Sequence, residues 1–184
     1  MKKVFITGAD GFIGSHIVEK LALSNKYEIK TLALYNHMNT YGWLDNIDKN
    51  IKKKIEIVSG DIKDYKFINN SIKNSNYVIN LAALIGIPYS YDASQSYIDT
   101  NILGTHNILN ACLENSVEKI IQTSTSEVFG SYASSEKLSE KSFQYAQSPY
   151  AATKIASDQL CNSFYSSYNL PVVIARPFNT FGPR

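Results

Sequence analysis

A tyrosine and a lysine stand four residues apart in the stretch Tyr150-Ala-Ala-Thr-Lys154. The apolar pattern around them predicts a helix from about Pro149 to Tyr168, on which this spacing places the phenol and the ammonium on one face. A cation close to a phenol favours the phenolate and lowers the tyrosine pKa toward the range of a general base. The same pair is common on helices without a catalytic role, so its meaning depends on its neighbours in the fold.

Hydroxyl groups and one carboxylate follow a predicted strand in Thr123-Ser-Thr-Ser-Glu127. An open α/β sheet binds its ligands beyond the carboxyl ends of its strands, so Thr125 is a candidate to hold a substrate hydroxyl. Turn formation is the structural alternative for these serines and threonines. Glu127 could likewise be a solvated loop carboxylate.

The element that would position a cofactor beside these groups lies at the N-terminus. Val4-Phe-Ile6 predicts a short buried strand, and Gly8, Gly11 and Gly14 follow before an apolar pattern of helical period. Strand, glycine turn and helix hold a dinucleotide pyrophosphate, because glycines let the backbone approach phosphates at the positive helix N-terminus. The spacing is not G-x-G-x-x-G, so a glycine turn in a non-binding α/β protein is the alternative.

Strand and helix patterns alternate along the rest of the chain. Further strands are predicted at Glu28–Leu34, Ile55–Val58, Tyr77–Leu81, Lys119–Thr123 and Pro171–Arg176, with long helices over Ser94–Asn115 and 149–168. This alternation predicts the α/β class, with a Rossmann-type, doubly wound parallel sheet covered on both faces. Residues 1–184 form one dinucleotide-binding domain in this interpretation. Because the last strand leads into further chain, we expect the N-terminal part of a longer protein, without its C-terminal substrate lobe.

Residues at the other strand ends bear on cofactor binding. The second strand ends in Tyr-Asn36-His, without the acid that binds ribose hydroxyls or the arginine that binds a 2′-phosphate, although Asn36 could bind the ribose. Asp61 could accept a hydrogen bond from the adenine amino group or cap the next helix. Ala82 and Ala83 leave space for a cofactor. The aromatic loop Thr40–Asp45 could cap the cofactor or a partner surface, or simply pack.

Composition and charge argue against several other classes. The 184 residues, 44% hydrophobic and 18% charged, indicate one globular domain with a sizeable core. A net charge of +2 gives no signal for nucleic acid, and no apolar run approaches the length of a membrane span. Cys112 and Cys161 lack metal-ligand spacing, which indicates reduced thiols in a cytoplasmic protein. The three histidines form no cluster, so no metal site is expected.

Four motifs occur in a fixed order: Gly8-x-x-Gly11-x-x-Gly14, Ser124-Thr125, Tyr150-x-x-x-Lys154 and Arg176-Pro-Phe-Asn179. Their combination resembles the extended short-chain dehydrogenase/reductase family, which contains NAD-dependent nucleotide-sugar epimerases and dehydratases, and the resemblance covers essentially the whole chain. It implies NAD as the cofactor, with NADP not excluded. The residues that it places at the cofactor are Gly8, Gly11, Phe12, Ile13, Gly14, Asn36, Asp61, Ile62, Leu81, Ala82, Ala83, Thr123, Tyr150, Lys154 and Pro177.

The resemblance also implies catalytic and substrate-binding residues. The catalytic set is Thr125, Ser126, Glu127, Tyr150 and Lys154, and the substrate-binding residues are Thr125 and Asn179. The implied partners are a nucleotide-sugar substrate and a second copy of the chain, which would form a homodimer through residues 94–115 and 149–168. Apolar positions in those two helices could equally belong to the core of a monomer.

Glu127 narrows the subclass that the resemblance implies. Thr125-Ser126-Glu127 is similar to the Thr-Ser-Glu signature of sugar 4,6-dehydratases, and the stretches 83–91 and 41–45 are similar to dehydratases of legionaminic-acid pathways, which act on nucleotide-linked N-acetylglucosamine. Tyr150 would remove the sugar O4 proton as hydride leaves C4 for the nicotinamide. Glu127 would then take the C5 proton, water would leave C6, and hydride would return to C6, giving a 4-keto-6-deoxy sugar.

Three other interpretations stay open. UDP-glucuronate decarboxylases carry a Thr-Ser-Glu run as well, but they need a cation for the C5 carboxylate of the sugar. Nucleotide-sugar 4-epimerases need only the tyrosine, lysine and threonine, which would make Glu127 incidental. A non-catalytic dinucleotide-binding module is the alternative from another class.

Overall fold

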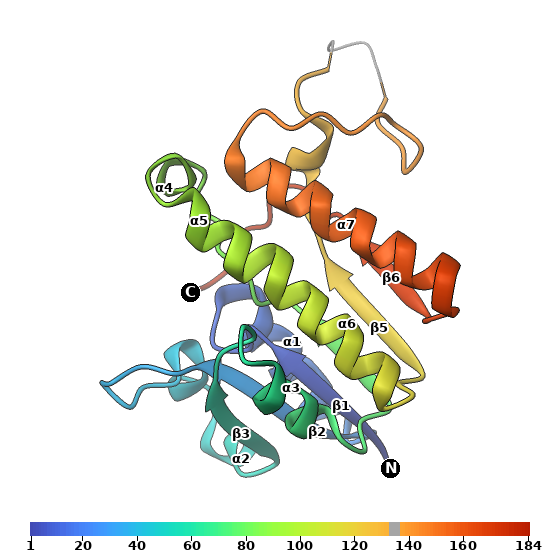
Figure 1. Ribbon diagram of the computed structural model, residues 1–184. Helices are drawn as coiled ribbons and strands as arrows, with labels where there is room; N and C mark the ends of the chain where they lie inside the picture. The colour runs from blue at the N-terminus through green and yellow to red at the C-terminus, as the bar shows by residue number, and fades with distance from the viewer. Residues whose placement is uncertain (133–136) are drawn as a thin grey trace.

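Six short segments rich in β-branched and aromatic residues form one parallel sheet (Figure 1). The computed structural model describes residues 1–132 and 137–184. Its strands are β1 (Lys2–Thr7), β2 (Tyr27–Leu34), β3 (Ile55–Gly60), β4 (Tyr77–Asn80), β5 (Lys119–Thr123) and β6 (Val172–Ala175). They lie in the order β3-β2-β1-β4-β5-β6, and every neighbouring pair is parallel. The predicted strands and the doubly wound sheet are confirmed.

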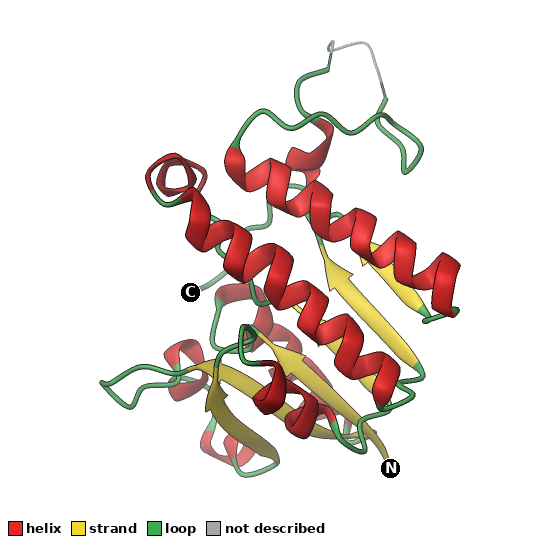
Figure 2. Cartoon of the chain, in the orientation of Figure 1, coloured by secondary structure: helices red, strands yellow, loops and turns green. Residues whose placement is uncertain are grey.

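Helices cover both faces of this sheet (Figure 2). The α-helices are α1 (Phe12–Ser24), α2 (Lys49–Lys52), α3 (Tyr65–Ile72), α4 (Ile87–Asp92), α5 (Ser94–Tyr97), α6 (Gly104–Glu114) and α7 (Pro149–Tyr168). Two 3-10 segments, η1 (Gly42–Asp45) and η3 (Ser126–Phe129), and a π segment, η2 (Ile98–Leu103), complete the described helices. On β1, Val4 and Ile6 pack in the cluster that contains Val18 of α1, whereas Phe5 packs with α3 and α6 on the opposite face.

The helix predicted over residues 149–168 is confirmed, whereas the single helix predicted over 94–115 is wrong in one respect. The chain is helical there, but the π segment η2 separates α5 from α6. Asn101 lies in this segment, and its side chain is buried. The Asn101 carbonyl oxygen accepts a hydrogen bond from the Leu84 nitrogen, and the Asn101 amide nitrogen donates to the Leu84 carbonyl oxygen and to the Thr153 hydroxyl of α7. A π segment commonly marks a place where a side chain is redirected for a tertiary contact, and apolar periodicity does not reveal it.

The start of α1 lies against the end of β1 with no room for side chains. A Cβ atom on Gly14 would lie 2.1 Å from the Gly8 carbonyl oxygen, and one on Gly8 would lie 2.7 Å from the Ala82 nitrogen. Gly8 also has a φ of +64°, which disfavours other residues. A Cβ on Gly11 would meet only the Gly8 carbonyl oxygen, at 3.3 Å. Gly8 and Gly14 are therefore required by the packing of the backbone, whether or not the turn binds a ligand.

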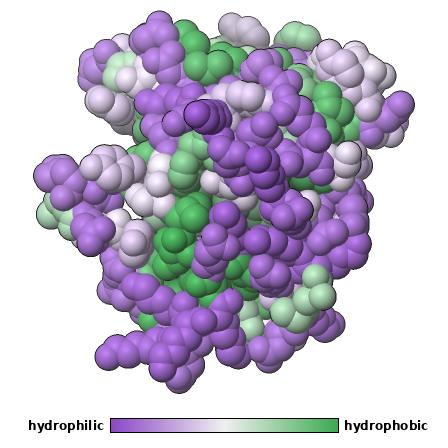
Figure 3. Space-filling model, turned by 60° about the horizontal axis from the view of Figure 1, so that its bottom comes forward, coloured by the Kyte–Doolittle hydropathy of each residue, from purple (hydrophilic) through white to green (hydrophobic). Residues whose placement is uncertain are grey.

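The molecular surface contains both hydrophilic and hydrophobic residues. Seen from the side shown in Figure 3, hydrophilic residues predominate and hydrophobic residues gather near the centre. Within residues 1–132 and 137–184, no helix has both the length and the hydropathy that crossing a bilayer requires. Both cysteines, Cys112 and Cys161, are free and buried.

Replacement of these glycines tests the packing of the turn. We expect Gly14→Ala to lower the free energy of unfolding by about 2 kcal/mol, because the methyl group would overlap the backbone of Gly8 and Ala9 in the turn after β1. Gly11→Ala should cost less than half as much, since its methyl group has only one neighbour. Urea unfolding of both variants measures the difference. Equal destabilisation by the two substitutions would contradict this account of the turn.

Candidate active site

A buried row of polar side chains ties together the carboxyl ends of β1, β4 and β5. The Thr7 hydroxyl donates to Asn80 Oδ1, and Asn80 Nδ2 donates to Gln122 Oε1 at 2.8 Å. All three residues are at most 2% exposed. Thr7 Oγ1 also accepts a hydrogen bond from the Ala82 nitrogen, so the chain leaving β4 is fixed beside the glycine turn. This edge lies where the strand order reverses between β1 and β4, which is where open α/β sheets bind ligands.

The glycine turn fits a diphosphate. Gly11 is the N-cap of α1, it offers no side-chain hydrogen bond to the helix, and the first turn of α1 contains no acidic residue. The amide groups at this end therefore keep their capacity for an anion, and the dipole of the helix favours one. Phe12 and Ile13 are half-buried beside the turn, and Gly11 itself is exposed.

The structure brings Thr125, Tyr150 and Lys154 together beyond β5. Thr125 follows β5 in an extended conformation, and its hydroxyl accepts a hydrogen bond from the Glu127 nitrogen at 3.2 Å. Tyr150 lies in the first turn of α7, whose N-terminus is capped by the Ser148 side chain. The Tyr150 phenol is within hydrogen-bonding reach of Thr125 and close enough to Glu127 for their charges to interact.

The electrostatics of the phenol differ from the sequence-based expectation. Burial raises the pKa of Tyr150, Thr125 lowers it, and the Glu127 and Tyr97 charges raise it again, so the net shift is upward. The expected lowering by Lys154 is therefore wrong for the protein without a ligand. The main physical reason is burial of the phenol, which disfavours the charged phenolate. The Lys154 ammonium donates a hydrogen bond to the Thr123 carbonyl oxygen, at 2.7 Å.

Lys154 is itself buried beside a buried ion pair. It is 4% exposed, and burial lowers its pKa to about 8, although Asp158 one turn further along α7 raises it. Asp158 is completely buried, and its Oδ2 accepts hydrogen bonds from Arg176 Nε at 2.8 Å and from the Gln144 amide at 3.2 Å. Our sequence analysis did not single out Asp158, although its four-residue spacing from Lys154 was a usable signal.

Three residues expected at the adenosine have other contacts. The Asn36 amide and carbonyl both bind the backbone of its own loop, including Thr40 and Leu34, so the side chain organises that loop. Ile62 is buried in the core against Gly104 of α6. Asp61 is half-buried and binds Lys63 through both oxygens, whereas Asp64 caps α3.

The remaining candidates lie along the same edge of the sheet. Leu81, Ala82 and Ala83 follow β4 and are half-buried, and Thr123 ends β5. The Pro177 carbonyl oxygen accepts a hydrogen bond from the Ser126 nitrogen, which joins the two strand ends, while Asn179 is exposed.

The segment that contains Asn179 continues from there to α1. The Pro183 carbonyl oxygen contacts His16 Nε2 at 2.9 Å, and Arg184 donates to the Ser15 hydroxyl at 2.8 Å. Residues 178–184 thus connect the β6 end of the edge with the first helix.

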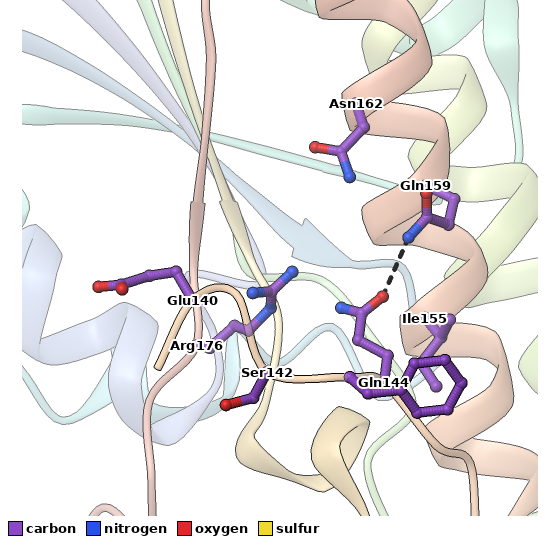
Figure 4. Close-up of a pocket in the computed structure, with 8 residues that line it drawn as sticks. Glu140, Ser142, Gln144, Ile155, Gln159, Asn162 and Arg176 are labelled. Carbon is purple, nitrogen blue, oxygen red and sulfur yellow. Dashed lines mark hydrogen bonds between the residues drawn. The ribbon is translucent and has the colours of Figure 1, made fainter. Parts of the chain in front are cut away.

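One cavity is separate from these groups. It has a volume of about 410 Å³ and lies between the 140–144 loop, α7 and Arg176 (Figure 4). Its α7 residues are Ile155, Gln159 and Asn162, and Gln159 donates to the Gln144 carbonyl oxygen at 3.0 Å. None of the candidate catalytic residues lines it. In the described chain, no group of three His, Cys, Asp or Glu residues could hold a metal ion.

The sheet order and the glycine turn at its reversal point define a Rossmann-type dinucleotide-binding domain. Comparison with known proteins gives the family. The family model described as GDP-mannose 4,6 dehydratase matches residues 5–184. The chain belongs to the NAD-dependent epimerase/dehydratase family of extended short-chain dehydrogenases/reductases, which includes nucleotide-sugar 4,6-dehydratases and epimerases.

Individual relatives agree with this placement. The chain is 30% identical to the dTDP-D-glucose 4,6-dehydratase of Dictyostelium discoideum, over 100% of this chain and 45% of that protein. It is 31% identical to the low-salt glycan biosynthesis protein Agl12 of Haloferax volcanii, over 98% of this chain and 57% of that protein. The chain thus spans about half the length of the curated relatives that it matches.

Solved structures show the same fold. A UDP-N-acetylglucosamine 4-epimerase from Methanobrevibacter ruminantium M1, in complex with UDP-N-acetylmuramic acid, superposes with a TM-score of 0.88 at 32% identity, over 100% of this chain and 56% of that one. A dTDP-glucose 4,6-dehydratase from Streptomyces venezuelae, with NAD and TYD bound, gives 0.84 at 28% identity, over 98% and 57%.

The lowered pKa of Lys154 predicts a pH-dependent contribution to stability. Unfolded lysine keeps its proton up to about pH 10.5, whereas folded Lys154 releases it near pH 8, so the unfolded state binds more protons between these values. The contribution of Lys154 to stability therefore rises with pH across this window. Relative to Lys154→Met, the wild type should gain about 1 kcal/mol between pH 7 and 9 in urea unfolding.

The exposed Lys20 of α1 provides the control, because Lys20→Met should show no such change over this pH range. A pH-independent difference between the wild type and Lys154→Met would mean that the buried ammonium titrates at its ordinary value.

Proposed function

We propose that this chain forms the cofactor-binding part of a nucleotide-sugar 4,6-dehydratase, acting on a UDP- or GDP-linked sugar such as N-acetylglucosamine. The observation that carries the proposal is the position of Glu127 in η3, directly beyond β5, where its nitrogen donates to the Thr125 hydroxyl at 3.2 Å. Its carboxylate is close enough to Tyr150 to help raise the pKa of the phenol. A dehydratase needs a second acid–base group beside the tyrosine, whereas an epimerase does not. The family match and the dTDP-glucose dehydratases among the relatives support this choice.

The proposed cofactor is NAD. Related structures contain it, including the Streptomyces dehydratase and a UDP-glucuronic acid 4-epimerase from Bacillus cereus. The uncapped glycine turn fits its pyrophosphate, and Ala82 and Ala83 lie beside that turn. A bound NAD would supply the acceptor and donor of hydride for C4 and C6 of the sugar, together with a positive charge.

The residues of the chain handle the protons. Tyr150 takes the proton from the sugar O4, and Thr125 orients that hydroxyl, so the C4 alcohol becomes a ketone. The ketone acidifies the C5 hydrogen, which Glu127 removes as a proton. The C6 hydroxyl leaves as water with a proton from Glu127 or from a group near Ser126. As hydride returns to C6, C5 takes up a proton, and the proton that Tyr150 took from O4 balances this uptake. Lys154 donates a hydrogen bond to the Thr123 carbonyl oxygen and so ties α7 to the end of β5, one turn along the helix from Tyr150.

One alternative has specific support. A 4-epimerase would use only Thr125, Tyr150 and Lys154, and several of the similar structures are 4-epimerases of UDP-sugars. A decarboxylase is less well supported, because the Arg176 guanidinium, directly after β6, is already paired with the buried Asp158. A non-catalytic dinucleotide-binding module would show NAD binding without turnover of any nucleotide sugar.

The expected homodimer is also a proposal. Helices α6 and α7 lie side by side on the outer side of the sheet (Figure 1), and Leu103, Tyr165 and Tyr168 on or beside them are 47%, 61% and 56% exposed. Light scattering after size exclusion measures the mass in solution. A monomeric mass at the concentrations used for the assays would contradict the dimer.

Replacement of Glu127 tests the dehydratase. With NAD and UDP- or GDP-linked N-acetylglucosamine, the wild type should release a product lighter by one water. Glu127→Gln should still reduce the cofactor but dehydrate about 10²- to 10⁴-fold more slowly, since acid–base help is removed from the second step only. Product mass spectra and the absorbance of the reduced cofactor report the two steps separately.

Tyr150→Phe is the matched control, because it should abolish both steps. Dehydration by Glu127→Gln at the wild-type rate would show that Glu127 has no such role. Unchanged product mass with an altered NMR spectrum would favour the epimerase, and loss of CO₂ from the glucuronate nucleotide would favour the decarboxylase.

A further inference from the structure

Asp10 lies inside the glycine turn, yet its side chain is directed to a different strand. It stands between Gly8 and Gly11, and its carboxylate Oδ2 accepts a hydrogen bond from the Leu34 nitrogen at 3.0 Å. Leu34 is the last residue of β2. A carboxylate therefore reaches the end of β2, the place where dinucleotide folds have an acid for the ribose hydroxyls. This chain has no acid of its own immediately after β2.

The position of Asp10 is fixed from a second side by the aromatic loop. The Trp43 nitrogen donates to the Asp10 carbonyl oxygen at 2.9 Å. Gly42 lies so close that a Cβ atom there would be 2.6 Å from this oxygen and 3.2 Å from the Asp10 Cβ, and its φ is +54°. The loop that our sequence analysis considered a possible cofactor cap is thus a support for Asp10. Because β2 holds the Asp10 carboxylate and η1 holds the Asp10 backbone, the side chain is preorganised for a ligand.

The charge on Asp10 has no compensation among the described residues. Its other oxygen, Oδ1, accepts no hydrogen bond there, and the carboxylate forms no ion pair with any described lysine, arginine or histidine. A free carboxylate in a phosphate-binding turn repels phosphate and costs affinity unless it recognises another group. A sugar hydroxyl can donate to Oδ1, whereas a phosphate at the same place would be repelled. Asn36, the alternative ribose ligand, is bound within its own loop.

We propose that Asp10 accepts a hydrogen bond from the 2′-hydroxyl of the adenosine ribose and excludes a 2′-phosphate, so that it makes the site selective for NAD over NADP. The proposal rests on the dinucleotide binding proposed above, and it adds the residue that chooses between the two cofactors. The selecting acid comes from the glycine turn in this chain, and the strand end contributes only the backbone nitrogen that orients it.

The test compares binding of NAD and NADP to the purified chain by titration calorimetry. The wild type should bind NAD at least about tenfold more tightly than NADP. Asp10→Asn keeps an acceptor for the Leu34 nitrogen but removes the charge, so the preference should fall by about tenfold. Glu28→Gln is the matched control: it removes one exposed carboxylate from the first half of β2, and the preference should not change.

A second measurement needs no variant that might fail to fold. The wild type should bind 2′-deoxy-NAD about tenfold more weakly than NAD, because Oδ1 loses its donor. Equal binding of NAD and NADP by the wild type, or an unchanged preference in Asp10→Asn, would overturn the assignment of Asp10 while leaving dinucleotide binding intact. Failure to bind either dinucleotide would overturn both this inference and the proposed function.

Discussion

The hydrogen-bonded row of Thr7, Asn80 and Gln122 is the constraint on which the site depends. Three polar side chains are buried beneath the carboxyl edge of the sheet, and each unmade hydrogen bond there would cost on the order of 1–3 kcal/mol. The row is satisfied only when β1, β4 and β5 end at matching heights. That register places the glycine turn, the chain after β4 and the hydroxyl-rich end of β5 along one edge.

Different residues along this edge serve packing and ligand recognition. Gly8 and Gly14 are needed because backbone meets backbone, and their replacement affects folding first. Asp10 has a different role, because a carboxylate beside a phosphate turn is unfavourable unless a ligand uses it. The short helix η1 joins the two roles, since it buries Leu44 in the core while Gly42 and Trp43 fix Asp10.

The electrostatics of the catalytic end follow from burial. Tyr150 is 6% exposed and Lys154 is 4% exposed, so without a ligand the phenol holds its proton more tightly and the ammonium less tightly than in water. The Asp158–Arg176 pair beside them opposes the shift of the lysine and joins α7 to the end of β6. Asp158, one turn along the same helix, therefore favours positive charge on Lys154 against the effect of burial.

The sequence by itself determined the fold class, the strands, helix α7 and the order of the motifs, because apolar periodicity and glycine spacing are local properties of the chain. The residues by themselves predicted Tyr150 and Lys154 on one helix face and Thr125 at a strand end, and the resemblance to the family grouped the three as a catalytic set. Only the tertiary structure decided the interruption at Asn101, the upward pKa shift of Tyr150, and the orientation of Asp10. Each of these depends on contacts between residues distant in sequence, and no local pattern encodes which donor a side chain will find or how much water it will lose.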